Sequence, residues 1–152
     1  MIDDRFTKGF ITGIMAGLVE TPFGLISYML DFGKLRFLDF AAIMIYGYKP
    51  ENFWEALFAQ IGYIMFSSLL GIVFVYLLLL ITSANIFLKS WFFAVAVWFF
   101  SYAVTLLFQV PELKEITFSS TISNYMSASI WGLALAYFAG KMDSRLKVNN
   151  KK

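Results

Sequence analysis

Apolar residues fall into long runs that are separated by short polar segments. A transmembrane helix needs about 20 consecutive and mostly apolar residues. Four runs reach that length, at about 9–30, 53–81, 86–108 and 121–140. The second run is longer than a bilayer requires, which indicates a tilted or projecting helix. The pattern predicts an all-α integral membrane four-helix bundle, with residues 1–152 forming a single membrane domain.

A shorter apolar run, at about 35–46, lies between the first two long ones. It is too apolar for a solvated loop and too short to span a bilayer, and such segments are typically interfacial, re-entrant or buried. Gly33 precedes the run and Gly47 follows it, while Pro50 lies near the first turn of the next helix, where proline costs little. We expect a short helix on the outer membrane surface, with a re-entrant segment as the alternative.

The composition agrees with a membrane protein. Hydrophobic residues make up 60% of the chain and charged residues 14%, against about 45–50% and 25% in soluble domains. The net charge of +2 is too small to indicate nucleic-acid binding. The chain contains no cysteine and no histidine, which excludes thiolate nucleophiles, imidazole bases and the usual zinc ligands. We therefore expect the lipid bilayer as a partner, no enzymatic activity, no metal site and no cofactor.

The distribution of basic residues predicts the orientation. Loops on the cytoplasmic side of a membrane protein carry an excess of Lys and Arg. If all four long runs cross the bilayer, one side carries Arg5, Lys8, Lys89, Lys141, Arg145, Lys147, Lys151 and Lys152, and the other carries Lys34, Arg36, Lys49 and Lys114. This bias predicts a multi-pass plasma-membrane protein with both termini in the cytoplasm and a basic cytoplasmic tail at 143–152.

Small residues recur every four positions in the first and last long runs. Lipid provides no hydrophobic drive for helix association, so small residues that allow close backbone contact become the packing signal. The stripes are Gly9, Gly13, Gly17 and Thr21 in the first run, and Asn124, Ala128, Gly132, Ala136 and Gly140 in the last. Their depths match when counted from the cytoplasmic side. We predict that the two helices are antiparallel neighbours joined through these stripes, with a homo-oligomer contact as the alternative.

Glu20 is the only acidic residue deep inside a predicted span. It lies about 16 Å along the helix axis from Gly9, which is near the middle of a hydrocarbon core about 30 Å thick. A charge at that depth costs about 2.5–3.5 kcal/mol, so we expect Glu20 to be neutral and to face polar groups inside the bundle. No Lys or Arg is expected at this depth. Counting depth along the other helices gives the candidate partners Ser67, Ser68, Ser101, Tyr102, Thr105, Asn124 and Ser127.

Pro22 follows Glu20 by two positions and leaves the carbonyl of Leu18 without its helical donor. Broken helices in transporters present ions and substrates with carbonyls that are freed in this way. Glu20, Thr21 and Pro22 therefore form a candidate intramembrane polar site. Two interpretations remain open: a structural contact between helices, and a site for an ion, a proton or a solute.

The glycine-striped first helix with its midplane Glu20, and the outer-loop segments 34–40 (KLRFLDF) and 49–54 (KPENFW), form a recognisable pattern. It resembles the small uncharacterised four-helix integral membrane proteins of bacteria. The resemblance implies membrane location and topology, and no assigned activity. We expect a non-enzymatic structural or partner subunit that associates with a second copy or with another membrane protein. The alternative is a small transport component that uses Glu20.

Overall fold

The computed structural model describes residues 4–81, 84–108, 113 and 116–142, and these residues form five helices and no strand. The helices are α1 (Arg5–Met29), α2 (Phe37–Tyr46), α3 (Phe53–Leu80), α4 (Ile86–Leu107) and α5 (Phe118–Met142). The all-α class is therefore confirmed, and every predicted apolar run coincides with a helix. The predicted basic tail at 143–152 lies outside the described residues.

Local sequence signals account for several helix ends. The Asp4 carboxylate accepts hydrogen bonds from the backbone N–H groups of Phe6 and Thr7 at the start of α1. Asn52 caps α3 by accepting from the backbone N–H of Glu55 at 2.9 Å. Both are N-cap residues, whose side chains satisfy amides that have no partner within the helix. α2 ends at Gly47, whose φ of +84° suits a residue without a side chain.

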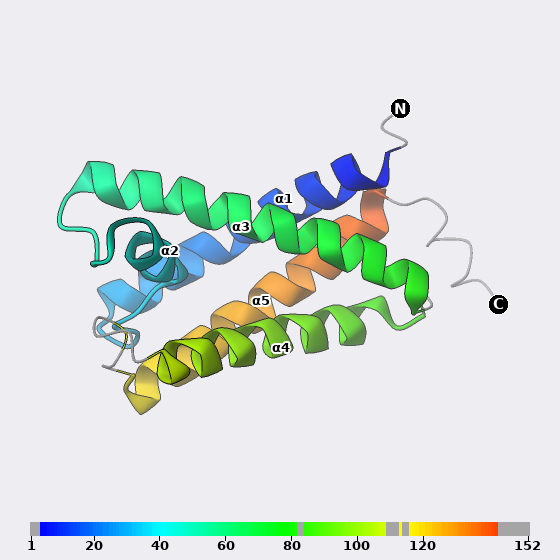
Figure 1. Ribbon diagram of the computed structural model, residues 1–152. Helices are drawn as coiled ribbons and strands as arrows, with labels where there is room; N and C mark the ends of the chain where they lie inside the picture. The colour runs from blue at the N-terminus through cyan, green and yellow to red at the C-terminus, as the bar shows by residue number, and fades with distance from the viewer. Residues whose placement is uncertain (1–3, 82–83, 109–112, 114–115, 143–152) are drawn as a thin grey trace.

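The four long helices lie beside one another (Figure 1). α1 contacts both α3 and α5, α4 packs on α5, and α2 packs on α3. The start of α1 and the end of α5 lie at the same end of the molecule (Figure 1), and the hydroxyl of Thr12 donates to the sulfur of Met142 at 3.6 Å. α1 and α5 are therefore antiparallel neighbours, as the sequence predicted.

The glycine stripe of α1 faces α3, and the prediction that it faces the stripe of α5 was wrong. A Cβ atom added at Gly9 would lie 2.6 Å from the Cα of Ile72. One added at Gly13 would overlap the backbone carbonyl of Ser67, whose hydroxyl donates to the Gly13 carbonyl at 2.7 Å. Gly71 makes the reciprocal approach to Gly9 and Gly13. Ser67 and Gly71 are small residues four positions apart in α3, so α3 can pack closely against the glycine face of α1.

The stripe of α5 turns toward α4 instead. A Cβ atom at Gly132 would lie 2.6 Å from the Cβ of Ala94, and the Ser90 hydroxyl donates to the Gly132 carbonyl at 2.6 Å. Gly140 has nothing within 4 Å of the equivalent position. Two other members of the stripe, Ala128 and Ala136, are buried. Each glycine stripe therefore serves a different neighbouring helix.

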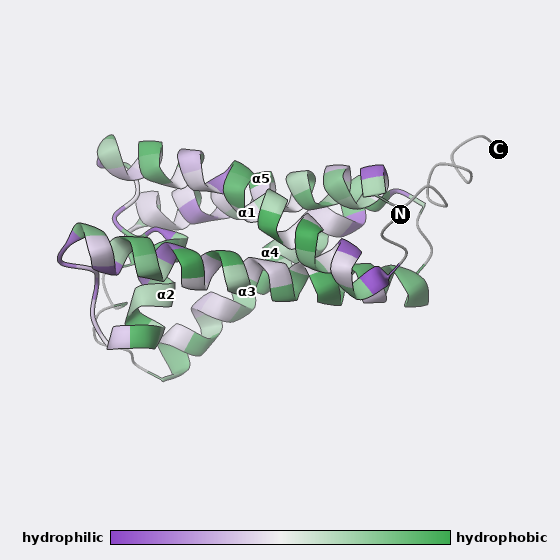
Figure 2. Ribbon diagram, turned by 90° about the horizontal axis from the view of Figure 1, so that it is seen from above, coloured by the Kyte–Doolittle hydropathy of each residue, from purple (hydrophilic) through white to green (hydrophobic). Residues whose placement is uncertain are grey.

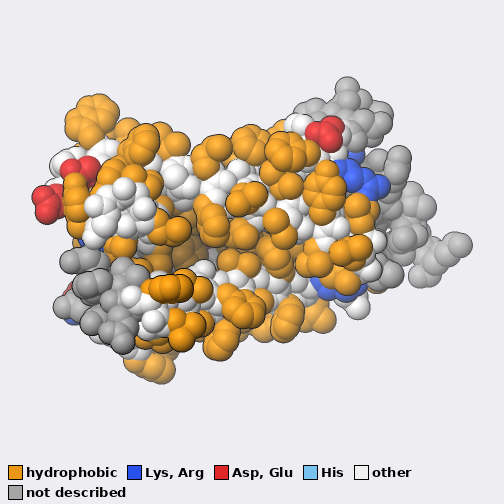
Figure 3. Space-filling model, viewed as in Figure 1, with side chains coloured by type: hydrophobic (Ala, Val, Ile, Leu, Met, Phe, Trp, Pro, Cys, Tyr) orange, Lys and Arg blue, Asp and Glu red, His pale blue; other side chains and the backbone are white. Residues whose placement is uncertain are grey.

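Many polar side chains are buried in the molecule, and many large apolar ones are exposed. The buried polar residues are Thr12, Glu20, Ser27, Asp39, Ser67, Ser68, Ser90, Ser120, Ser123, Asn124 and Ser127. Large apolar side chains are exposed on all five helices. α3 is hydrophobic along most of its length (Figure 2), and the visible face of the molecule is mostly hydrophobic with charged side chains toward its ends (Figure 3). A hydrophobic core is present as well, around Phe74, Trp131 and Leu135, so the feature that departs from a soluble domain is the extent of the exposed apolar surface.

Three helices, α1, α3 and α4, are long and apolar enough to cross a membrane. α5 has 25 residues but is not among them. Its first half contains the polar residues that lower its hydropathy, Ser119, Ser120, Thr121, Ser123, Asn124, Ser127 and Ser129. The described structure thus supports three candidate spans where the sequence predicted four.

Candidate functional site

Glu20 is buried in the contact between α1, α3 and α5, with 2% of its surface exposed. The hydroxyl of Tyr63 in α3 donates to its Oε2 atom at 2.8 Å. The side chain of Ser127 in α5 is its second polar neighbour. Hydroxyl groups can hydrogen-bond a carboxylate or a carboxylic acid. Glu20 is therefore buried with uncharged partners, of which the sequence named Ser127 and missed Tyr63.

Thr21 makes a second polar link from α1 to α3. Its hydroxyl donates to the carbonyl of Gly17 at 2.8 Å, which satisfies the hydrogen within its own helix. The same oxygen accepts from the side-chain nitrogen of Gln60 at 2.8 Å. Glu20 and Thr21 are thus both tied to α3, by residues three positions apart on one face of that helix.

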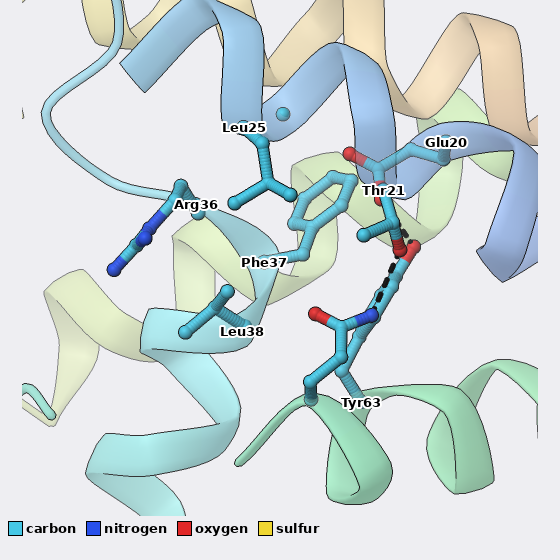
Figure 4. Close-up of a pocket in the computed structure, with 9 residues that line it drawn as sticks. Glu20, Thr21, Leu25, Arg36, Phe37, Leu38 and Tyr63 are labelled. Carbon is cyan, nitrogen blue, oxygen red and sulfur yellow. Dashed lines mark hydrogen bonds between the residues drawn. The ribbon is translucent and has the colours of Figure 1, made fainter. Parts of the chain in front are cut away.

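A small pocket adjoins Glu20 between α1, α2 and α3 (Figure 4). Its free volume is about 10 Å³, close to the room that one water molecule needs. It is lined by Glu20, Thr21, Gly24, Leu25, Arg36, Phe37, Leu38, Gln60 and Tyr63. One carboxyl oxygen of Glu20 points toward the space between Leu25 and Phe37 (Figure 4). A Cβ atom at Gly24 would lie 3.0 Å from Oε1, so the glycine leaves that oxygen room.

α2 provides the opposite wall of the pocket. The ring of Phe37 stacks on that of Tyr63, with centroids 5.8 Å apart. Leu38 is buried and packs with Ala42 and Ala59. At the other end of α2, the hydroxyl of Tyr46 donates to the backbone carbonyl of Glu55 at 3.4 Å. α2 therefore runs along about two turns of α3, and its first residues lie deeper in the molecule than its last.

Arg36 also lines this pocket, although its charged group lies about two turns beyond Glu20 along α1. The chain after α1 folds back and brings residue 36 beside the last turns of that helix, where its guanidinium lies 4.0 Å from the ring centre of Tyr28. Arg36 points away from Glu20 (Figure 4) and donates through two nitrogens to the buried Asp39, at 3.1 and 2.8 Å. The positive charge is thus neutralised within α2.

Asn124 and Tyr102 form a separate polar contact. The side-chain nitrogen of Asn124 donates to the Tyr102 hydroxyl at 2.7 Å and links α5 to α4. Ser67 contributes to a third contact, since it accepts from the indole nitrogen of Trp131 at 2.7 Å while it donates to Gly13. The predicted single polar site is therefore divided among several pairs of helices.

The remaining predicted site residues bond within their own helices. Ser68 donates to the carbonyl of Met65, Ser101 to that of Val97 and Thr105 to that of Tyr102. Such bonds satisfy the hydroxyl locally and need no neighbouring helix. These three residues are not part of the Glu20 pocket.

Pro22 is exposed, and α1 continues through it as one helix to Met29. Two positions correspond to about 200° around a helix of 3.6 residues per turn, so Pro22 and the buried Glu20 lie on nearly opposite faces. Leu18, whose carbonyl loses its donor, is 51% exposed. The structure does not bring the proline-freed carbonyl and the Glu20 carboxyl into one site.

Depth counting missed Tyr63 and Gln60 because it assumed that the start of α1 and the end of α3 lie at one level. Gly9 lies opposite Ile72, so α3 extends about two turns beyond that point and Glu20 faces a part of α3 nearer its start than the count indicated. A sequence signal was present, since Gln60, Tyr63 and Ser67 follow one another at spacings of three and four. That spacing places them on one helix face.

No family model, curated protein or solved structure matches this chain. The resemblance to small four-helix bacterial membrane proteins therefore stays a prediction. The function has to be argued from the molecule itself.

Proposed function

We propose that this chain is a multi-pass integral membrane protein. The observation that carries the proposal is the large number of exposed apolar side chains along the long helices, together with the polar residues buried between them. In water, such an extensive apolar surface favours association or aggregation. In lipid, the apolar surface faces hydrocarbon, and interior polar groups have to find partners within the protein.

In this proposal α5 is the fourth span and both termini are cytoplasmic. Its polar residues are largely buried against α1 and α4, which supports a span that presents its apolar side to lipid. The start of α1 and the end of α5 lie at one end of the molecule, as an even number of crossings requires (Figure 1). Arg5, Lys8 and Lys141 belong to that end, which agrees with the positive-inside rule.

The molecular role that fits best is a non-enzymatic structural or partner subunit of the plasma membrane. Side-chain hydrogen bonds link α1 to α3, α1 to α5, α3 to α5 and α4 to α5. Bonds of this kind contribute roughly 0.6–2 kcal/mol each between membrane helices. α3 and α4 keep most of their apolar windows unburied, at 22% and 17% buried. That surface is open to lipid, to a second copy or to another membrane protein.

Single-cysteine labelling tests the topology, because the native chain has no cysteine to interfere. Lys49→Cys lies before α3 and Asn85→Cys lies before α4, on opposite sides of the proposed bilayer. A membrane-impermeant maleimide should label the first in intact cells and the second only after permeabilisation. Leu135→Cys, at a fully buried position in α5, is the unlabelled control. Equal labelling of both loops in intact cells would refute the four-span topology.

The pocket beside Glu20 supports a second candidate, a small transport component. A buried carboxyl next to space for a water molecule is what a proton or ion site requires. Replacement of Glu20 by Gln separates the two roles, because the amide can still accept from Tyr63. The structural role predicts a folded and fully functional variant. The transport role predicts a folded variant that no longer exchanges an ion or a proton.

A further inference from the structure

We propose that the pocket beside Glu20 binds one small monovalent cation, Na⁺ or Li⁺, in exchange for the proton of the Glu20 carboxyl. This inference rests on the transport candidate above and deepens it by naming the ion. It requires no particular membrane topology.

The polar wall of the pocket consists of oxygen ligands. Glu20 presents its Oε1 atom, while Thr21 and Tyr63 add hydroxyl oxygens. Gln60 uses its nitrogen to bond Thr21, which leaves its amide oxygen as the acceptor. Carboxylate, hydroxyl and amide oxygens are the ligands that hard cations prefer. The described residues contain no cluster of three acidic, His or Cys side chains suited to a multivalent or transition metal.

The charges around the pocket select a single positive charge. Glu20 supplies one negative charge when its proton leaves, and its polar neighbours Tyr63, Gln60 and Ser127 are uncharged. Arg36, the other charged residue that lines the pocket, forms a neutral pair with Asp39 of α2. A monovalent cation therefore restores neutrality as the proton did, whereas a divalent ion leaves a buried excess charge, which is costly. The water-sized space excludes a large or hydrated ion.

The exchange balances in protons and charge. The O–H bond of the Glu20 carboxyl breaks and its proton passes to the solvent as the cation binds the carboxylate. Tyr63 keeps donating to Oε2 in both states. Leu25 lines the pocket and is 40% exposed, on the side of the molecule where α2 lies (Figure 1). Exchange therefore occurs from the α2 side, away from the termini.

Proton release on adding salt tests the proposal. The purified full-length protein, in detergent and weak buffer, is titrated with NaCl and, at equal ionic strength, with choline chloride. We expect NaCl to release up to one proton per chain and to raise the melting temperature. LiCl should have the same two effects, and choline chloride should have neither. Glu20→Gln should abolish the release, and Glu51→Gln, the same change at an exposed carboxyl, should retain it.

Thr21→Val provides a second readout that leaves the carboxyl in place. Loss of this ligand should weaken the affinity for Na⁺ by about tenfold or more, as the loss of a supporting residue at a metal site commonly does. Proton release should persist at higher NaCl concentrations. Equal responses to NaCl and choline chloride, or unchanged release from Glu20→Gln, would overturn the cation site. Neither result would touch the proposed membrane topology, which the cysteine labelling tests separately. An unchanged Na⁺ affinity in Thr21→Val would show that Thr21 is not a ligand and would overturn the proposed site.

Discussion

The two halves of α1 contact α3 in different ways. From Gly9 to Gly13 the backbones themselves touch, and an added Cβ would meet backbone atoms of Ser67 and Ile72. At Gly17 the nearest atoms belong to side chains of α3. Beyond it, from Glu20 to Gly24, the helices are bridged by Tyr63 and by a pocket. The two helices therefore diverge along α1.

The difference shows how one helix pair combines a fixed contact with an open site. Close packing needs small residues and leaves no room for chemistry. Where the helices separate, long polar side chains and the ring of Phe37 in α2 occupy the gap. The glycine half sets the geometry, and the polar half holds Glu20, the only buried acidic residue within the three candidate spans.

The largest effect is expected from adding a side chain in the tightly packed half of α1. Gly13→Leu should destabilise the protein by about 3 kcal/mol or more, because its side chain collides with the α3 backbone, which cannot move aside cheaply. The measurement is thermal unfolding in detergent. Gly140→Leu, at a helical glycine with open space around it, should stay within about 0.5 kcal/mol of the native protein. Similar losses in both variants would contradict the close contact.

A smaller effect is expected from the polar half. Tyr63→Phe should cost about 1–3 kcal/mol, since Glu20 stays buried and loses its donor. Unfolding midpoints of this variant are compared with those of Tyr76→Phe, the same change at a tyrosine of α3 that is 46% exposed. A Tyr63→Phe midpoint equal to that of the control would mean that the hydrogen bond contributes nothing.

Glu20→Gln should cost less than about 1 kcal/mol, because the amide oxygen can replace Oε2 as the acceptor for Tyr63. The free energy of unfolding is measured as for Tyr63→Phe, which serves as the reference for a lost bond. A cost as large as that of the reference would show that the charge or proton of Glu20, rather than its acceptor, stabilises the contact.

The smallest effect is expected at the first turn of α1, ahead of both halves. Hydrogen bonds from the Thr7 side chain, and then from backbone amides, lower the pKa of the Asp4 carboxyl. Its capping contribution is therefore complete above the ordinary pKa of an aspartate and is lost as the pH falls through the lowered value. Hydrogen-exchange protection of the Thr7 amide should fall over that range, and Asp4→Ala should abolish the pH dependence. If protection of the Thr7 amide changes with pH to the same extent in Asp4→Ala, the effect belongs to another group.

The helices could be predicted from the sequence because their apolar runs are long and their caps are local. The contact of α1 with α5 also followed from antiparallel depth. The helix faces that meet could not be predicted, because a glycine stripe indicates a close neighbour but does not identify the neighbouring helix. All four long helices have small residues four positions apart, and only the packed structure pairs Gly13 with Ser67.

The site was predictable in part for a related reason. The burial of Glu20 and its neighbour Ser127 followed from depth alone. The position of Tyr63 at the site depends on the offset between α1 and α3. The position of Arg36 depends on the way the chain folds back before α2. Neither is encoded in the composition of a single run.

The distance along the chain between Glu20 and Tyr63 has a consequence for synthesis. The two residues are 43 positions apart, and ribosomes add roughly 5–20 residues per second, so the acid exists for about 2–9 seconds before its partner is made. In the proposed membrane setting α1 cannot complete its final contacts on entry. It has to wait, protonated or beside water at the insertion site, until α3 arrives.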